Sequence, residues 1–278
     1  MQLGHKAKII QVPVPTPTLY PHTTTNCYLI GNEYESLLVD AGYDRKETKV
    51  EIEKAIEQNH LARPEKIILT HSHRDHAPGV RQLSDWSPTV YCHKNEKRGI
   101  IEAISPISKI SYIADEATLN IASLKLVVLH GPGHTSGQIN IYIPSEQILL
   151  AGDNIVAEGT TWIGPPEGNM SEYIQTLNRL KRLKLTCIGP GHGQWIKNPY
   201  EQLEFVLKRR LQRENQIKSL LVNHEYLTAT QLTEKIYENT IHPSVFYVAK
   251  KTIEAHLIKL INEGTVGQKD LNYFIVGS

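Results

Sequence analysis

The sequence predicts an α/β domain followed by a small winged-helix-like domain. Between about residues 8 and 197, short apolar runs typical of strands alternate with helical periodicity. Histidines and aspartates stand directly after several of these runs, at the ends of the predicted strands. From residue 198 onward the pattern changes to amphipathic helices that end in a hairpin-like segment. We therefore expect two domains, residues 1–197 and residues 198–278.

Length and composition are those of an ordinary globular protein. At 278 residues the chain can bury one large core, or a core plus a small appended domain. The formal charge of +1 and the 21% of charged residues favour neither nucleic acid nor a membrane as a partner. No apolar run approaches the length of a membrane span, and Met1 to Lys6 lack the apolar core of a secretion signal. We expect a cytoplasmic protein that does not contact a membrane.

The three cysteines, Cys27, Cys92 and Cys187, are widely separated, odd in number and set in apolar surroundings. This pattern is typical neither of a disulfide framework nor of a thiolate metal site. We expect all three to fill the core of a protein in a reducing compartment.

The first strands are predicted at residues 8–12, 26–31 and 36–42. Gly31 and Asn32 form a turn signal, so the second and third strands are expected to pair antiparallel. Asp40 ends the third strand. Its carboxylate can hydrogen-bond a metal-bound histidine, or it can cap the helix that follows. The sequence leaves both roles open.

An α/β layer follows. Helical periodicity over residues 47–60 leads into a strand at 66–70, a helix near 80–83 and a strand at 89–91. Residues 94–115 are polar and irregular in pattern. We expect them to form a flap that faces the substrate, or a solvated surface loop.

The motif after the strand at 66–70 contains His71, His73, Asp75 and His76 within six residues. If the strand continues to the first two histidines, alternation points both rings the same way, so they can share one metal ion. Asp75 and His76 enter a turn, where they can face a second ion. Imidazole and carboxylate without thiolate suit zinc best, and the same donors accept manganese or iron. The plainer alternative, exposed polar residues at a strand end, explains four donors at this spacing poorly.

Three later segments repeat this arrangement. Strands within residues 119–129 end at a glycine-rich loop from which His134 projects, whereas His130 lies on the strand and is expected to be structural. A hairpin of residues 139–142 and 147–150 ends at Asp153, whose two oxygens can bridge two ions. A strand at 184–188 ends at a second glycine-rich loop that carries His192.

Between Asp153 and His192, residues 158–169 are predicted to form a long loop, which can wall a pocket. Ser171 is expected to cap a helix that runs to about Leu183, with Glu172 in its first turn. Donors predicted to stand at strand ends are thus His71, His73, Asp75, His76, His134, Asp153 and His192. They suffice for two metal ions that keep an open position for water.

Helices are predicted over residues 200–223, 228–238 and 244–263, followed by a short hairpin within residues 265–276. Three helices and a hairpin are typical of a winged-helix-like domain. Residues 200–278 contain ten Lys and Arg against nine Asp and Glu, and Lys208-Arg209-Arg210 is only a local basic cluster. Because a strong nucleic-acid binder is distinctly basic, packing against the core or formation of a homodimer is at least as good an explanation of this domain.

The order of these motifs resembles the metallo-β-lactamase superfamily, in which His-x-His-x-Asp-His is followed by separate His, Asp and His motifs. The resemblance implies an αββα sandwich with two zinc ions, Mn²⁺ or Fe²⁺ being accepted by the same donors. It implies that His71, His73 and His134 hold the first ion and that Asp75, His76 and His192 hold the second. Asp153 would bridge both. Asp153 stands where class B1 lactamases place a cysteine, so antibiotic hydrolysis is not expected as the main activity.

Two further features of the sequence indicate which branch of the superfamily the chain resembles. The oxygen-reducing di-iron branch of the superfamily has glutamate at the position of His73 and a flavodoxin domain, so a hydrolase is favoured over a redox enzyme. The winged-helix-like appendage resembles the lactamase-beta-2-like subgroup. Members of that subgroup are described as single-stranded RNA endonucleases, and relatives act as thioesterases.

The sequence is therefore compatible with three functions. The first is hydrolysis of an activated ester, such as a thioester or a lactone, by a hydroxide that bridges the two ions, with Asp75 as the catalytic residue that orients the water and accepts its proton. The second is endonucleolytic cleavage of single-stranded RNA. The third is a non-enzymatic nucleic-acid-binding or regulatory protein with a vestigial metal site. Hydrolysis of glutathione thioesters ranks lower, because the C-terminus has no convincing basic tail.

Overall fold

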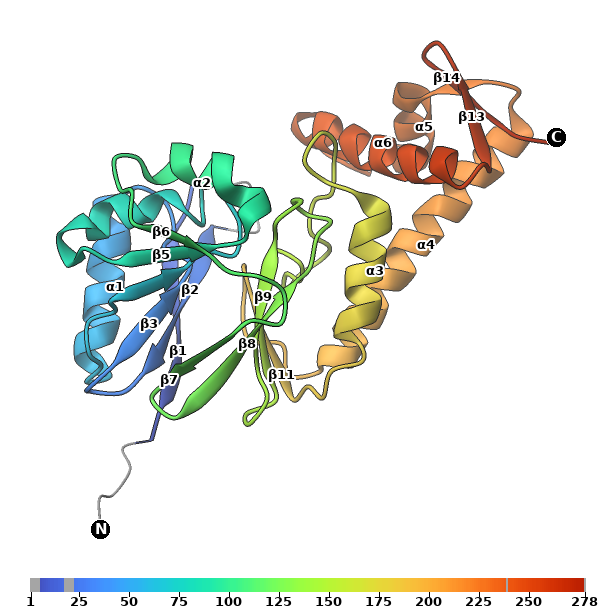
Figure 1. Ribbon diagram of the computed structural model, residues 1–278. Coiled ribbons are helices and arrows are strands. Elements are labelled where there is room, and N and C mark those ends of the chain that lie inside the picture. Colours follow the sequence, from blue (N-terminus) through green and yellow to red (C-terminus); the bar gives the residue numbers. More distant parts are fainter. Residues whose placement is uncertain (1–5, 18–22, 239, 278) are drawn as a thin grey trace. The chain divides into compact units, whose positions relative to one another are not determined.

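The structure is a computed structural model that describes residues 6–17, 23–238 and 240–277 (Figure 1). Met1 to His5, which enter the expectation about a secretion signal, lie outside these residues. The elements in chain order are β1 (Lys8–Pro15), β2 (Thr24–Gly31), β3 (Ser36–Val39), α1 (Lys46–Gln58), β4 (Lys66–Ile68), η1 (Pro78–Trp86), β5 (Thr89–Cys92), η2 (Lys94–Glu96), α2 (Lys97–Ile104), β6 (Ile110–Tyr112), β7 (Thr118–Ile121), β8 (Leu124–His130), β9 (Ile139–Ile143), β10 (Ile148–Gly152), α3 (Met170–Leu180), β11 (Cys187–Pro190), α4 (Pro199–Asn223), β12 (Leu227–Thr228), α5 (Ala229–Tyr237), η3 (Pro243–Val245), α6 (Phe246–Asn262), β13 (Val266–Lys269) and β14 (Asn272–Ile275).

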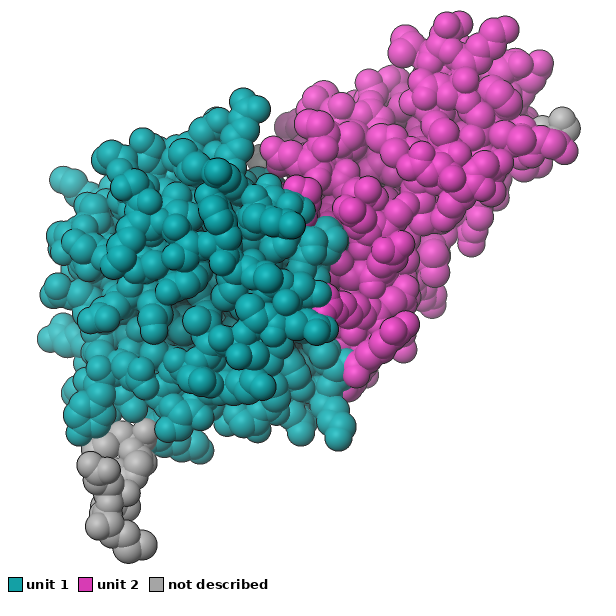
Figure 2. Space-filling view, in the orientation of Figure 1, with its two compact units in different colours: residues 1–132, 137–159, 183–199 teal, residues 133–136, 160–182, 200–278 magenta. Residues whose placement is uncertain are grey.

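The chain divides into two compact units, which Figure 2 colours separately. The first consists of residues 1–132, 137–159 and 183–199, and the second of residues 133–136, 160–182 and 200–278. The predicted domain boundary between residues 197 and 198 stays a prediction.

The first unit is built on two sheets that share a hydrophobic core. One sheet has the strand order β1-β2-β3-β4-β5-β6, and the other has the order β11-β10-β9-β8-β7. Strands β2 and β3 pair antiparallel, as the turn signal at Gly31 predicts. Alternate residues such as Ile30 and Ile68 of the first sheet pack with Leu126 and Ile141 of the second. The predicted α/β sandwich is confirmed.

The other face of the six-stranded sheet packs against α1, α2 and η1 through a second core that includes Ile52, Leu83 and Ile100 (Figure 1). Residues 94–115 contribute to this layer through η2, α2 and β6. The prediction of a polar flap or surface loop there is wrong. Ile100 and Ile104, one helical turn apart, are both completely buried, and their burial stabilises the helix although Lys97, Arg98 and Glu102 on its exposed face are charged.

The second unit contains α3 and α4. Helix α3 begins after Asn169, whose side-chain oxygen accepts hydrogen bonds from the amides of Ser171 and Glu172. The prediction that Ser171 caps this helix is therefore wrong by two residues. Both residue types favour the cap position, and here asparagine supplies the acceptor.

The second unit also contains a three-stranded sheet of order β12-β14-β13. Its core joins Ile217 of α4, Leu232 of α5 and Leu257 of α6. Helix α5 starts with a capping box in which Thr228 and Gln231 bond each other's backbone amides. Helices and a hairpin in this order confirm the predicted winged-helix-like domain.

Two smaller expectations can be checked in the same structure. Cys27 and Cys92 are buried, as predicted, whereas Cys187 is partly exposed. Within residues 6–17, 23–238 and 240–277, no helix combines the length and the apolar character that crossing a membrane requires.

Candidate metal centre

The predicted ligands stand in loops that follow strands β4, β8, β10 and β11. Strand β4 ends at Ile68, two residues before the predicted end at residue 70, so the condition that strand geometry continues to His71 and His73 is not met. The two rings nevertheless lie close together, with centroids 4.6 Å apart. An extended loop therefore gives the pair the proximity that was expected from strand alternation.

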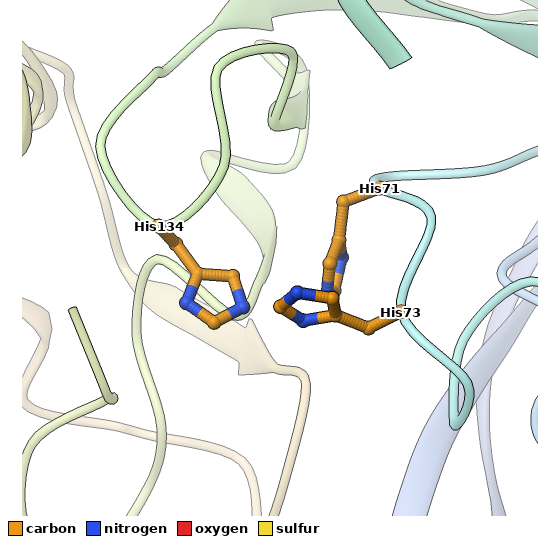
Figure 3. Close-up of side chains that lie close together, drawn as sticks. All are labelled: His71, His73 and His134. Carbon is orange, nitrogen blue, oxygen red and sulfur yellow. The ribbon is translucent and has the colours of Figure 1, made fainter. Parts of the chain in front are cut away.

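Figure 3 shows the imidazoles of His71, His73 and His134 turned toward one another. One ring nitrogen from each of them lies within 4.8 Å of the other two. Three imidazoles at this separation form a group that could hold one metal ion.

Two further groups share His76. The first is His71, His76 and Asp153, and the second is Asp75, His76 and His192. His76 Nε2 lies 3.1 Å from Asp153 Oδ1 and 3.6 Å from Asp75 Oδ2. His192 Nε2 lies 3.2 Å from Asp75 Oδ2 and 3.5 Å from Asp153 Oδ1. The structure thus brings all seven predicted ligands into three overlapping groups.

Backbone carbonyls fix the ring orientation of two of these histidines. Nδ1 of His134 lies 2.8 Å from the carbonyl oxygen of Trp162, and Nδ1 of His192 lies 2.8 Å from that of Thr24. Because a carbonyl oxygen only accepts hydrogen bonds, both Nδ1 atoms must carry a proton. In each ring Nε2 is then the nitrogen available to a metal.

Asp40 organises the loop that carries four of the ligands. Its carboxylate lies 2.8 Å from His76 Nδ1 and accepts hydrogen bonds from the amide and the hydroxyl of Thr70. The Thr70 hydroxyl is in turn 3.0 Å from His71 Nδ1. Helix α1 is capped at Arg45, so the alternative role of Asp40 as a helix cap is wrong. The predicted hydrogen bond to a histidine of the site is present.

The donor set fits a divalent metal ion such as zinc. His76 Nε2 is buried and faces the carboxylates of Asp153 at 3.1 Å and Asp75 at 3.6 Å. A metal ion bound between this nitrogen and these oxygens would compensate the two buried carboxylates. The three groups contain only imidazole and carboxylate, donors that zinc, manganese and iron accept.

The buried carboxylates and imidazoles of the site shift one another's pKa values. Burial lowers the pKa of His192, but the Asp153 carboxylate outweighs it and raises that pKa to about 10. Burial also lowers the pKa of His76, but the negative charges of Asp153 and Asp75 outweigh this effect. The pKa of His76 therefore lies well above its ordinary value. Burial raises the pKa of Asp75, yet the neighbouring His76 and His192 bring it down to about 2. In the metal-free protein the two imidazoles therefore carry protons near neutral pH.

We expect zinc binding to release protons, because a metal can bind Nε2 of His76 and His192 only after their protons leave. Below the His192 pKa of about 10, each proton so displaced should raise apparent zinc affinity about tenfold per pH unit. Calorimetric titration at pH 7.5 in buffers of different ionisation enthalpy should show at least about two protons released per chain.

The matched variant for this titration is His192→Gln, which should release about one proton fewer than the unmodified chain. A binding heat independent of the buffer would contradict the assignment of these histidines.

Several residues that contact the candidate ligands have almost no signal in the sequence that would indicate this role. The hydroxyl of Thr25 donates to Asp75 Oδ2 over 3.3 Å, and Thr70 links Asp40 to His71. Trp162 and Thr24 act through backbone oxygens, which any residue type could supply. Only the position of Thr70 directly before His71 was a local hint.

Arg210 differs from the other members of the basic cluster at residues 208–210. It is 5% exposed, donates to the carbonyl oxygen of Thr161, and lies over the ring of Tyr173 at 5.4 Å. Thr161 precedes Trp162, whose carbonyl orients His134. Arg210 is thus part of the packing beside a candidate ligand rather than of a basic surface.

His130 belongs to none of the three groups among the described residues. Its ring stacks on that of His93, with centroids 4.0 Å apart and planes at 15°. This packing agrees with the structural role expected for a histidine on a strand.

Two family models match the chain. Residues 21–192 match the metallo-beta-lactamase superfamily, and residues 228–272 match the beta-lactamase associated winged helix domain. The first match covers more than half of the chain and includes all the candidate ligands.

Similar sequences come from animals and fungi. A beta-lactamase-like protein 2 homolog of Caenorhabditis elegans is 29% identical, covering 87% of this chain and 80% of its own length. The homolog of the same name in Drosophila melanogaster is 27% identical, and the match covers 93% of this chain and 89% of the Drosophila protein. An atrochrysone carboxyl ACP thioesterase of Aspergillus fumigatus is 27% identical over 72% of this chain and 60% of its own length.

A solved structure supports the fold over nearly the whole chain. A metallo-beta-lactamase family protein from Thermus thermophilus superposes with a TM-score of 0.81 at 23% identity, covering 96% of this chain and 98% of that one. At this identity the likeness concerns the fold alone.

Proposed function

The chain belongs to the metallo-beta-lactamase superfamily and is a hydrolase, and we propose that it cleaves an activated ester, with a thioester as the favoured substrate. The observation that carries this proposal is the convergence of five histidines and two aspartates in three groups that overlap at His71 and His76. The name of the fungal relative, an acyl carrier protein thioesterase, supports the choice of substrate class.

We further propose that two zinc ions bind here. His71, His73 and His134 would hold one, while Asp75, His76 and His192 would hold the other. Asp153 would bridge them, because it forms one group with His71 of the first proposed site and His76 of the second. The overlap of the three groups at His71 and His76 supports two adjacent sites rather than one.

When bound, a pair of zinc ions would lower the pKa of a water molecule toward neutrality and polarise the ester carbonyl. The chain's own contribution is orientation and proton transfer. Asp75, whose pKa of about 2 keeps it ionised, would accept the proton of the attacking water. The hydroxyl of Thr25 holds one oxygen of Asp75, which leaves the other oxygen for the water.

The charge of the C-terminal residues favours a small substrate over RNA. Ten basic against nine acidic residues over 200–278 provide little attraction for a phosphate backbone. Arg210, in the most basic run of this segment, is buried and bonded to the Thr161 carbonyl. An RNA-cleaving enzyme would have to bind its substrate elsewhere.

A panel of substrates tests the proposal. Zinc-loaded protein should hydrolyse a short-chain acyl thioester of N-acetylcysteamine, and this activity should disappear in Asp75→Ala. The same samples should be tested with a lactone and with an unstructured RNA oligomer.

Cleavage of RNA without thioester or lactone hydrolysis, lost in the same variant, would replace the ester proposal by the endonuclease alternative. Full zinc occupancy with no turnover of any compound would instead favour a non-enzymatic binding protein.

A further inference from the structure

We propose that Glu96 is a positioning residue that ties the loop of His71 and His73 to the loop that follows His134. The inference rests on the ligand assignment made above, and it adds a residue that contacts none of the proposed ligands through its side chain. Glu96 is the last residue of η2, immediately before α2.

Each carboxylate oxygen of Glu96 accepts a hydrogen bond from a different loop. Oε2 lies 3.0 Å from the amide nitrogen of Ser72, which stands between His71 and His73. Oε1 lies 3.0 Å from the amide nitrogen of Gly137, three residues after His134. One rigid carboxylate therefore fixes two backbone segments at a set separation.

Burial makes these two bonds necessary. Glu96 is 4% exposed, and a buried carboxylate is costly unless it is paired or hydrogen-bonded. The hydrogen bonds of its two oxygens come from backbone amides rather than from a lysine, arginine or histidine side chain. The two amides are thus its main compensation, and hydrogen bonds to an ionised acceptor are stronger than neutral ones.

Helix capping does not account for the placement of the Glu96 carboxylate. Glu96 stands at the N-cap position of α2, but its side chain forms no hydrogen bond with the first amides of that helix. Its carboxylate is directed to the two loops instead.

Close packing on both sides leaves the carboxylate little freedom. A Cβ atom added at Gly137 would lie 2.7 Å from Glu96 Cγ and 2.7 Å from its backbone nitrogen. A Cβ atom at Gly99 would lie 2.5 Å from Ser72 Oγ. Glycine at both positions allows α2 and the loops to approach closely enough for the two hydrogen bonds.

The test is zinc binding, measured without substrate. Glu96→Gln keeps the shape of the side chain but places an amide NH₂ group opposite one of the two backbone N–H groups. We expect its affinity for zinc, from competition with a chromophoric chelator, to fall about 10- to 100-fold, the usual range for residues that support metal ligands. Gly137→Ala should lower affinity in the same direction, because it displaces the carboxylate.

The matched control is Glu102→Gln. Glu102 lies on α2, which directly follows Glu96, and forms an exposed pair with Arg98 at 3.2 Å, so its loss should leave zinc affinity within about threefold of the unmodified chain.

A second measurement separates positioning from general stability. In the metal-free protein, amide hydrogen exchange at Ser72 and Gly137 should accelerate in Glu96→Gln while exchange in strands β2 and β9 stays unchanged. The absorption spectrum of the cobalt-substituted variant should also shift, because ligand geometry changes. Faster exchange throughout the chain with an unchanged cobalt spectrum would assign Glu96 a merely structural role.

Zinc affinity of Glu96→Gln within about threefold of the unmodified chain would overturn the proposal, even if thioester hydrolysis is confirmed. An unmodified chain that binds no zinc would overturn it together with the ligand assignment. If zinc affinity falls as expected but no ester is hydrolysed, the positioning role stands and only the proposed substrate fails.

Discussion

Asp153→Asn is expected to reduce bound zinc from two ions per chain to one or none and to lower kcat/KM about 10³-fold, on the order of 4 kcal/mol. Asp153 forms one group with His71 of the first proposed site and His76 of the second, and its Oδ1 lies 3.1 Å from His76 Nε2, so its charge would serve both halves. A neutral amide has only one oxygen and cannot compensate two cations. Elemental analysis after gel filtration gives the stoichiometry.

The control for this variant is Asp85→Asn, which removes an exposed carboxylate paired with Lys49 at 2.8 Å. It should keep two zinc ions and full activity, because exposed ion pairs contribute little. Two zinc ions retained in Asp153→Asn would contradict a bridging role for Asp153.

Asp75→Asn is expected to separate catalysis from binding. Its amide oxygen keeps a ligand atom, but it cannot accept a proton at neutral pH. We expect kcat for the thioester to fall about 10²- to 10⁴-fold, the usual contribution of a general base, while KM changes less than about threefold. Steady-state kinetics on zinc-saturated protein provides both constants.

Thr25→Val offers a graded comparison, since it removes only the hydroxyl that donates to Asp75 Oδ2. A loss of about tenfold or somewhat more in kcat is expected, because one hydrogen bond to a charged group is worth roughly 1.5 kcal/mol or somewhat more. If Asp75→Asn kept its kcat within about tenfold, proton transfer would have to be assigned to another group.

The sequence indicates where the candidate ligands stand because each lies in a loop that follows an apolar strand. His134, Asp153 and His192 follow β8, β10 and β11, and strand ends are found from hydrophobic patterns that are local in the chain. Helices with a clear apolar stripe, such as α1 and α4, are predicted for the same reason.

Features that depend on a distant partner are not visible in the sequence. By pattern alone Glu96 is a polar residue of an irregular segment, and only the folded chain shows both of its oxygens bound to amides 24 and 41 residues away. Arg210 is part of a basic cluster in the sequence, yet it is buried over Tyr173. In both cases a tertiary contact decides the role of a residue whose type alone suggests exposure.

Local sequence preferences can also favour two residues for the same structural role. Asn169 and Ser171 are both good cap residues, and the pattern alone could not choose between them. Asp40 combines a left-handed backbone, φ of 58°, with bonds to Thr70 and His76. A single aspartate at a strand end does not reveal that conformation.

Anomalous X-ray diffraction at the zinc absorption edge, from crystals of the zinc-loaded protein, tests the central claim most directly. Two peaks should appear, one within bonding distance of His71, His73 and His134, at about 2.0–2.1 Å from each nitrogen, and the other near Asp75, His76 and His192. Asp153 should contact both. A single peak, or peaks outside these residues, would contradict the proposed pair of metal ions.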